Sequence, residues 1–115
     1  LKGANRTFLV PAVLAKVLES GEDAVKLFGA LKTYSYGASP IAEDLLMKAK
    51  DVFGCKFSQL FGLTETSGAG TWLAPEDHDP ARKKLRSCGK PLPGMDLRIV
   101  DGAGKDVPAG EVGEI

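Results

Sequence analysis

The chain has 115 residues and a mass of 12.1 kDa, the size of one domain or of part of one. Its 15 Lys and Arg residues balance 15 Asp and Glu residues, so the formal net charge is zero. This balance argues against a dedicated nucleic-acid binder, which carries a clustered basic excess. With 43% apolar and 26% charged residues, the composition is that of a globular protein and not of a disordered chain.

Two cysteines, Cys55 and Cys88, are too few for a disulfide framework and favour a reduced, cytoplasmic setting. The longest apolar run, residues 8–15, is interrupted by Pro11 and is far shorter than the ~20 residues that span a bilayer. The sequence has no signal-peptide pattern. It begins without a methionine and stops inside an expected strand, so we expect a piece of a longer protein.

The first half of the chain alternates between predicted helices and strands. Apolar residues recur at helical spacing over residues 11–20, and Gly21 marks the end of this helix. A shorter helical stretch follows at residues 22–28. Residues 31–36 are rich in Tyr and Thr and are followed by a glycine, which predicts a short strand.

The clearest helix comes next. Ser39 is expected to cap it and Pro40 to occupy its first helical position, with acidic residues in the first turn and one apolar face. Gly54 ends this helix. Residues 56–61 then form the next predicted strand.

Strand, helix and strand in this order form a βαβ unit, so the two strands should be parallel with a right-handed crossover. The carboxyl ends of parallel strands lie at one edge of the sheet, where open α/β sheets bind their ligands. We therefore expect the turns Gly37-Ala38-Ser39-Pro40 and Gly62-Leu63-Thr64-Glu65 to face one crevice together.

Beyond residue 66 the pattern changes to turns and short strands, with a strand expected at residues 97–100 and another from residue 112. The predicted fold class is therefore α/β. It consists of a βαβ unit of a parallel sheet flanked by helices, followed by a β-rich piece, as a fragment of a larger domain. We divide the chain into a partial α/β subdomain, residues 1–80, and the start of a β-rich subdomain, residues 81–115.

The two turns carry residue types that suit a nucleotide. Gly37-Ala38-Ser39-Pro40 lacks bulk, so its backbone can approach a flat ligand; an ordinary βα turn is the alternative. In Phe61-Gly62-Leu63-Thr64-Glu65 the ring can stack on a base, the hydroxyl can bond a phosphate and the carboxylate can hold a hard cation. The alternative is a core phenylalanine, a turn-capping threonine and a solvated glutamate.

Four segments together resemble a known family. Tyr36-Gly37-Ala38-Ser39-Pro40-Ile41 and Gln59-Leu60-Phe61-Gly62-Leu63-Thr64-Glu65-Thr66 closely resemble two core motifs of the adenylate-forming superfamily, which includes acyl-CoA synthetases, luciferases and nonribosomal peptide adenylation domains. Ser87-Cys88-Gly89-Lys90-Pro91-Leu92-Pro93-Gly94-Met95 and Gly110-Glu111-Val112-Gly113-Glu114-Ile115 agree as well. All four occur in the order of the family.

The resemblance implies a nucleotide site with an aromatic wall. The turn Gly37-Ala38-Ser39-Pro40 would line one face of the adenine. Phe61, which stands where the family usually has tyrosine, would stack on the other face. Gln59, Leu60 and Gly62 would help to line the nucleotide and acyl cavity.

The same resemblance implies catalytic roles for two residues. Thr64 would bond the α-phosphate of ATP, and Glu65 would coordinate the Mg²⁺ that bridges the phosphates. In the family a carboxylate attacks the α-phosphorus of ATP to give acyl-AMP and pyrophosphate, and coenzyme A then displaces AMP.

Gln59, Leu63 and Thr66-Ser67-Gly68 look more like fatty acyl-CoA synthetases than like peptide adenylation domains. The expected substrates are thus a carboxylic acid of the fatty-acid class, ATP and coenzyme A. The alternatives are another adenylate former, such as an aryl-CoA ligase or a luciferase-like enzyme, and a non-catalytic nucleotide- or partner-binding module.

Parts of the family pattern fall outside this chain: the phosphate-binding loop, the aspartate that grips the ribose, and the C-terminal domain with its lysine. We therefore expect the isolated chain to be inactive, and to self-associate through sheet edges and apolar patches. His78 is expected among exposed loop residues, with a metal cluster as the alternative. Arg82-Lys83-Lys84 and Arg86 are expected on a solvated loop face, with attraction of a CoA phosphate as the alternative, and Cys88 is expected to be structural.

Overall fold

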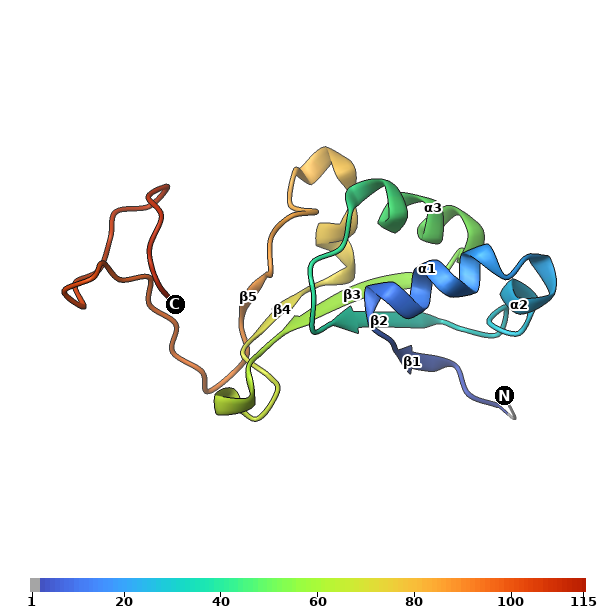
Figure 1. Ribbon diagram of the computed structural model, residues 1–115, viewed down its shortest axis with the longest axis horizontal. Coiled ribbons are helices and arrows are strands. Elements are labelled where there is room, and N and C mark those ends of the chain that lie inside the picture. The colour runs from blue at the N-terminus through green and yellow to red at the C-terminus, as the bar shows by residue number, and fades with distance from the viewer. Residues whose placement is uncertain (1–2) are drawn as a thin grey trace.

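The computed structural model describes residues 3–115 (Figure 1). The helices are α1 (Pro11–Glu19), α2 (Glu22–Lys26) and α3 (Glu43–Phe53). The strands are β1 (Arg6–Phe8), β2 (Thr33–Gly37), β3 (Lys56–Phe61), β4 (Thr71–Leu73) and β5 (Lys90–Pro91). Short 3-10 helices follow the third and fourth strands: η1 (Thr64–Thr66), η2 (Pro75–His78) and η3 (Pro80–Arg82).

The strands form one sheet in the order β1-β2-β3-β4-β5. β1, β2 and β3 are parallel, whereas β4 and β5 are antiparallel to their neighbours. The predicted βαβ unit is confirmed as β2, α3 and β3, and the α/β fold class with it. β1, β4 and β5 are additions that the sequence pattern did not predict, because strands of two or three residues show no alternation to recognise.

Alternation along the strands gives the sheet two unlike faces. On one face Tyr34, Tyr36 and Phe57 are buried beneath the helices, together with Leu14 of α1 and Leu46 of α3. The rings of Tyr34 and Phe57 stack with their centroids 5.1 Å apart. Figure 1 shows α1 and α3 side by side over this face. Each such side chain stabilises the fold by about 1.5–3 kcal/mol through burial.

The opposite face is covered by none of the three α-helices that the structure describes (Figure 1). Phe8, Ser35 and Ser58 lie in register across β1, β2 and β3, and the hydroxyl oxygens of the two serines are 2.9 Å apart. Leu60 lies opposite Trp72. Phe8 is 49% exposed and Trp72 43% exposed, although parallel sheets usually bury both faces. Apolar surface thus remains open on this side.

The start of α3 differs from the prediction. The helix begins at Glu43 with Ala42 as its N-cap residue, so Ser39 does not cap it and Pro40 is not its first residue. Ala42 is extended, with φ −71° and ψ 140°, and Ile41 packs against the core. Residues 38–42 therefore form an irregular connection that bends at Ala38 and Ser39, and this path lets the Ile41 side chain reach the core. The predicted end at Gly54, which has φ 59°, is confirmed.

The C-terminal segment runs away from the sheet (Figure 1). Instead of the two expected strands it contains single bridges from Val100 to Asp106 and to Glu114. The Val100 amide donates to the Glu114 carbonyl oxygen over 2.8 Å, and the reverse bond has the same length. Val112 is 99% exposed, so the apolar side chains here lack a packed layer that would extend the pairing. Among the described helices, none has the length and apolar character needed to cross a bilayer.

Candidate functional site

Two turns meet where β2 and β3 end. Gly37 at the end of β2 lies opposite Leu60 of β3 in the parallel register, so the chain leaves both strands at one edge of the sheet. A Cβ atom at position 37 would lie 2.2 Å from the Leu60 carbonyl oxygen. Only glycine fits this close approach, which brings the first turn directly against the second strand.

The turn after β2 is held in an uncommon backbone conformation. Ala38 has φ 66°, in the left-handed region, which costs an alanine about 1 kcal/mol or more. Ala38, Ser39 and Pro40 are exposed, whereas the next residue, Ile41, is half-buried against the core. Ala38 therefore joins the buried strand β2 to the exposed residues 39 and 40. The surrounding packing must maintain its left-handed conformation.

The turn after β3 is fixed by hydrogen bonds to Leu63. Its amide donates to the Thr66 hydroxyl over 2.9 Å, and that hydroxyl donates to the Leu63 carbonyl oxygen over 3.0 Å. The amide of Gly68 donates to the same carbonyl oxygen over 2.8 Å. These bonds close η1 and leave Thr64 and Glu65 exposed on its outer side. Thr66 is part of the second motif, but its hydrogen bonds to the Leu63 backbone were not predicted from the sequence.

A first cleft of about 480 Å³ lies between the two turns. Seven of its lining residues were predicted from the motifs: Ala38, Ser39, Pro40, Gln59, Leu60, Phe61 and Gly62. Leu63 also lines it and stands in the turn that was expected to face the crevice, whereas Ile41, Leu85, Arg86 and Cys88 were not expected there. Gln59 and Phe61 share the sheet face that the helices cover, because side chains alternate along β3.

A second cleft of about 510 Å³ adjoins the first at the same edge. It shares with the first cleft Ala38, Leu60, Gly62 and Leu63. Its other lining residues are Phe8, Thr64, Ser67 and Gly68. Phe8 and Leu60 belong to the open face of the sheet, so the two clefts lie on either side of the turns.

Two candidate residues line neither cleft. Gly37 is buried at the end of β2, where it allows the close approach described above. Glu65 is exposed on η1, next to Thr64, which lines the second cleft. Among residues 3–115, no three or more His, Cys, Asp or Glu side chains gather in a group that could hold a metal ion.

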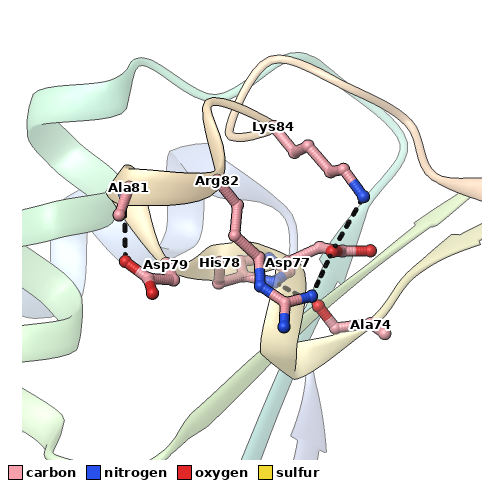
Figure 2. Close-up of polar contacts among 7 residues, drawn as sticks. All are labelled: Ala74, Asp77, His78, Asp79, Ala81, Arg82 and Lys84. Carbon is pink, nitrogen blue, oxygen red and sulfur yellow. Dashed lines mark hydrogen bonds and ion pairs between the residues drawn. The ribbon is translucent and has the colours of Figure 1, made fainter.

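The wall formed by residues 85–88 was missed by the sequence analysis. Arg86 is exposed, as expected of a solvated loop, and both Arg86 and Cys88 also line the first cleft, which was not expected. Asp77 accepts hydrogen bonds from Arg82 over 3.0 Å and from Lys84 over 3.1 Å, which folds the loop back (Figure 2). Hydrogen bonds from Arg82 and Lys84 hold the pKa of Asp77 below its usual range. An acidic run, Glu76 to Asp79, followed by a basic run, Arg82 to Arg86, was a local signal of the fold-back.

His78 corrects a second expectation. It is not an exposed loop residue but is 1% exposed, at the end of η2. Its Nε2 lies 3.1 Å from the Tyr36 hydroxyl oxygen, and its Nδ1 lies 2.8 Å from the Ala74 carbonyl oxygen. Lys50 of α3 donates to the His78 carbonyl oxygen. Burial lowers the pKa of His78, so the imidazole is neutral at pH 7.

The comparisons with known proteins agree with this geometry. A family described as AMP-binding enzyme matches residues 2–115. The fatty acid–acyl-carrier-protein ligase ScoC of Streptomyces coeruleorubidus is 37% identical over 113 residues, which is 98% of this chain and 22% of that protein. The medium/long-chain fatty-acid–CoA ligase FadD8 of Mycobacterium tuberculosis is 39% identical over 109 residues, 95% of this chain and 19% of that protein.

Solved structures show the same arrangement. The amide bond synthetase McbA from Marinactinospora thermotolerans has a TM-score of 0.82 and 28% identity, covering 97% of this chain and 22% of that one. The anthranilate CoA ligase AuaEII, in complex with anthranoyl-AMP, has a TM-score of 0.78 and 28% identity, covering 95% and 20%. This chain spans about a fifth of the length of the curated relatives it matches. It belongs to the AMP-binding enzyme family, the adenylate-forming superfamily that its motifs resemble.

Proposed function

We propose that this chain is part of an ATP-dependent acid–thiol ligase that converts a fatty acid to its acyl-AMP and then to the coenzyme A thioester. The observation that carries the proposal is the meeting of two motif turns around one cleft, in a member of the AMP-binding enzyme family. Ligation of fatty acids by ScoC and FadD8 supports the same substrate class.

In this proposal the first cleft binds the adenylate. The exposed turn of Ala38, Ser39 and Pro40 covers one face of the adenine, and Phe61 stacks on the other. An aromatic ring keeps this function without a hydroxyl, because stacking uses only the ring face. Gln59, on the same face of the sheet as Phe61, supplies the polar side chain of this wall.

Thr64 and Glu65 act on the phosphates. The Thr64 hydroxyl is exposed at the second cleft, where it can donate a hydrogen bond to an α-phosphate oxygen. Mg²⁺ at nucleotide sites takes one or two carboxylates together with substrate phosphates, so the single exposed carboxylate of Glu65 fits a metal that arrives with ATP. When bound, the metal offsets negative charge that develops on the phosphates.

The chemistry divides into two displacements. A carboxylate oxygen of the acid attacks the α-phosphorus, the bond to the bridging oxygen breaks, and pyrophosphate leaves. The coenzyme A thiolate then attacks the carbonyl carbon, and AMP leaves. The residues of this chain hold the nucleotide and the acid in line for the first displacement, and such positioning contributes a large share of rate enhancement.

The second cleft suits an apolar acyl group. Phe8, Leu60 and Leu63 supply apolar side chains at the open face of the sheet, next to the turn that carries Thr64. An aryl acid is the alternative substrate, which the anthranilate CoA ligase AuaEII illustrates. A carrier-protein thiol is the alternative acceptor, as in the name of ScoC.

The walls of the two clefts belong to one part of the proposed enzyme. Residues 1–80 form the proposed partial α/β subdomain and residues 81–115 the start of the β-rich one. The chain spans about a fifth of its relatives, so we expect the remaining catalytic groups in the longer protein and no turnover by this chain alone. A nucleotide-binding module without catalysis is the competing function.

The test uses the full-length protein with ATP, magnesium, a fatty acid and coenzyme A. Wild type should release pyrophosphate and form an acyl-CoA, whereas Glu65→Gln should release pyrophosphate about 100-fold more slowly with an unchanged circular dichroism spectrum. Glu111→Gln, an exposed carboxylate in the C-terminal segment, is the control and should match wild type. Full activity of Glu65→Gln would remove its metal role. A wild-type protein that binds ATP without acid-dependent pyrophosphate release would support the non-catalytic module instead.

A further inference from the structure

A buried polar network lies behind the first cleft and contains no residue that lines it. His78 and Tyr36 are 1% and 0% exposed, and their rings meet edge to face with centroids 5.7 Å apart. Tyr36 precedes Gly37, the last residue of β2 and the start of the adenine-side turn. The network therefore reaches the position from which the first wall of the cleft departs.

The direction of each hydrogen bond in this network follows from its partners. The Ala74 carbonyl oxygen can only accept, so Nδ1 of His78, 2.8 Å away, carries the proton. Nε2 of the neutral ring is then an acceptor, and the Tyr36 hydroxyl donates to it over 3.1 Å. Burial raises the pKa of Tyr36 to about 12, so this hydroxyl keeps its proton. Both ring nitrogens of His78 are satisfied.

Tyr34 shows that this bond is specific to position 36. Tyr34 lies two residues earlier on the same face of β2 and is also buried, yet its hydroxyl has no hydrogen-bond partner among the described residues. A tyrosine ring on this face packs well without its hydroxyl being bonded. The bond from Tyr36 to His78 therefore fixes the end of the strand in a way that ring packing alone does not.

His78 is itself held on several sides. Its carbonyl oxygen accepts a hydrogen bond from Lys50 of α3. Its neighbour Asp77 binds Arg82 and Lys84, as Figure 2 shows, and thereby sets the path of the loop that leads to Leu85. Leu85 is buried in the core and lines the first cleft. The segment that carries His78 thus connects two of the walls of that cleft, residues 38–40 and residues 85–88.

We propose that His78 is a positioning residue for the nucleotide: through the Tyr36 hydroxyl it fixes the wall of residues 38–40 relative to the wall of residues 85–88. Ala38, with φ 66°, gives the reason that such support is needed. A strained connection holds its shape only when its neighbours over-determine it. This inference rests on the proposed function, because it assigns the first cleft to the adenylate.

The test measures pyrophosphate release by the full-length protein while ATP and acid are varied separately. Tyr36→Phe removes one oxygen atom and leaves the ring, so it is expected to raise the KM for ATP about tenfold, with kcat and the KM for the acid unchanged. Tyr34→Phe is the matched control on the same strand and should keep the wild-type KM for ATP.

A second pair of variants separates positioning from packing. His78→Gln keeps a side-chain carbonyl that can accept from Tyr36 and should keep the KM for ATP near wild type. His78→Leu cannot accept a hydrogen bond and should raise this KM as Tyr36→Phe does. Urea unfolding of all variants reports any loss of stability independently of the kinetics.

The outcomes distinguish the two levels of the proposal. If Tyr36→Phe and Tyr34→Phe have the same KM for ATP in an active enzyme, or if Tyr36→Phe lowers only the unfolding midpoint, the positioning role is wrong and the ligase function stands. If wild type shows no acid-dependent pyrophosphate release, the ligase function fails and the positioning role with it. A selective rise in the KM for ATP, restored by His78→Gln relative to His78→Leu, supports the positioning role.

Discussion

Substituting Gly62 by alanine is the sharpest test of how the turn after β3 is built. A Cβ atom at position 62 would lie 2.4 Å from the Gly68 carbonyl carbon and 2.5 Å from the Ala69 amide nitrogen. Nonbonded heavy atoms settle at about 3.5–4.0 Å, so the new methyl group would overlap backbone by about 1 Å. Because backbone atoms cannot swing aside like the end of a side chain, the turn itself must move.

The expected cost follows from that overlap. Overpacking typically costs about 1–3 kcal/mol, and contact with backbone on two neighbouring residues places Gly62→Ala near the upper end, about 3 kcal/mol. Such a loss lowers the ratio of folded to unfolded protein about 100-fold. With a urea m-value of about 1.5 kcal/mol/M, the midpoint of unfolding should fall by about 2 M. Nucleotide affinity should fall as well, because the bond from Gly68 to Leu63 holds the same turn.

The assay is urea unfolding followed by the fluorescence of Trp72, the single tryptophan, which lies on β4 beside this turn. Gly102→Ala is the matched control, because no atom lies within 4 Å of the Cβ it would add and its φ is ordinary. The control should stay within about 1 kcal/mol of wild type. A Gly62→Ala midpoint equal to that of Gly102→Ala would refute the close-contact argument.

Two further predictions concern strain and protonation. Ala38→Gly should raise the thermal midpoint by about 3 °C, because relief of about 1–2 kcal/mol of left-handed strain exceeds the added entropy of the unfolded chain; a lower midpoint would contradict this. His78, which faces the charges of Lys50, Glu76 and Asp77, has a folded-state pKa lowered chiefly by burial. The unfolded state therefore binds more protons, so stability should be full above about pH 6.5 and fall by up to about 1.4 kcal/mol per pH unit below it. His78→Gln should flatten this part of the urea-midpoint profile, and an unchanged slope would contradict the assignment.

Elements with a clear apolar pattern that is bounded by glycine or proline could be predicted from the sequence. β3 occupies the expected residues 56–61, and α1 begins at Pro11 as expected. The shared edge of β2 and β3 also follows from local information. A strand, a helix and a strand in succession form a right-handed crossover between parallel strands, so both strands end at the same edge of the sheet. Most of the motif-derived lining of the first cleft rests on this single topological step.

The start of α3 shows where local rules fail. Proline after serine is a good helix opening, yet the chain becomes helical only at Glu43. The Ile41 side chain packs against a core made largely by distant elements. Tertiary burial of one side chain thus outweighs a capping preference of about 1 kcal/mol. The short strands β1, β4 and β5 could not be predicted for the same reason, because pairing with neighbouring strands defines them and local sequence does not.

His78 and the wall of residues 85–88 show why a site can exceed its motifs. The two walls on β2 and β3 arise within one βαβ unit, whereas the third depends on a loop that folds back onto Asp77. The partner that buries the imidazole, Tyr36, is 42 residues away in sequence, so no local pattern can signal it. Motif spacing locates the residues that contact a ligand. In the proposed positioning role, buried hydrogen bonds behind the walls fix their relative placement, so substitutions there should change affinity without touching the ligand.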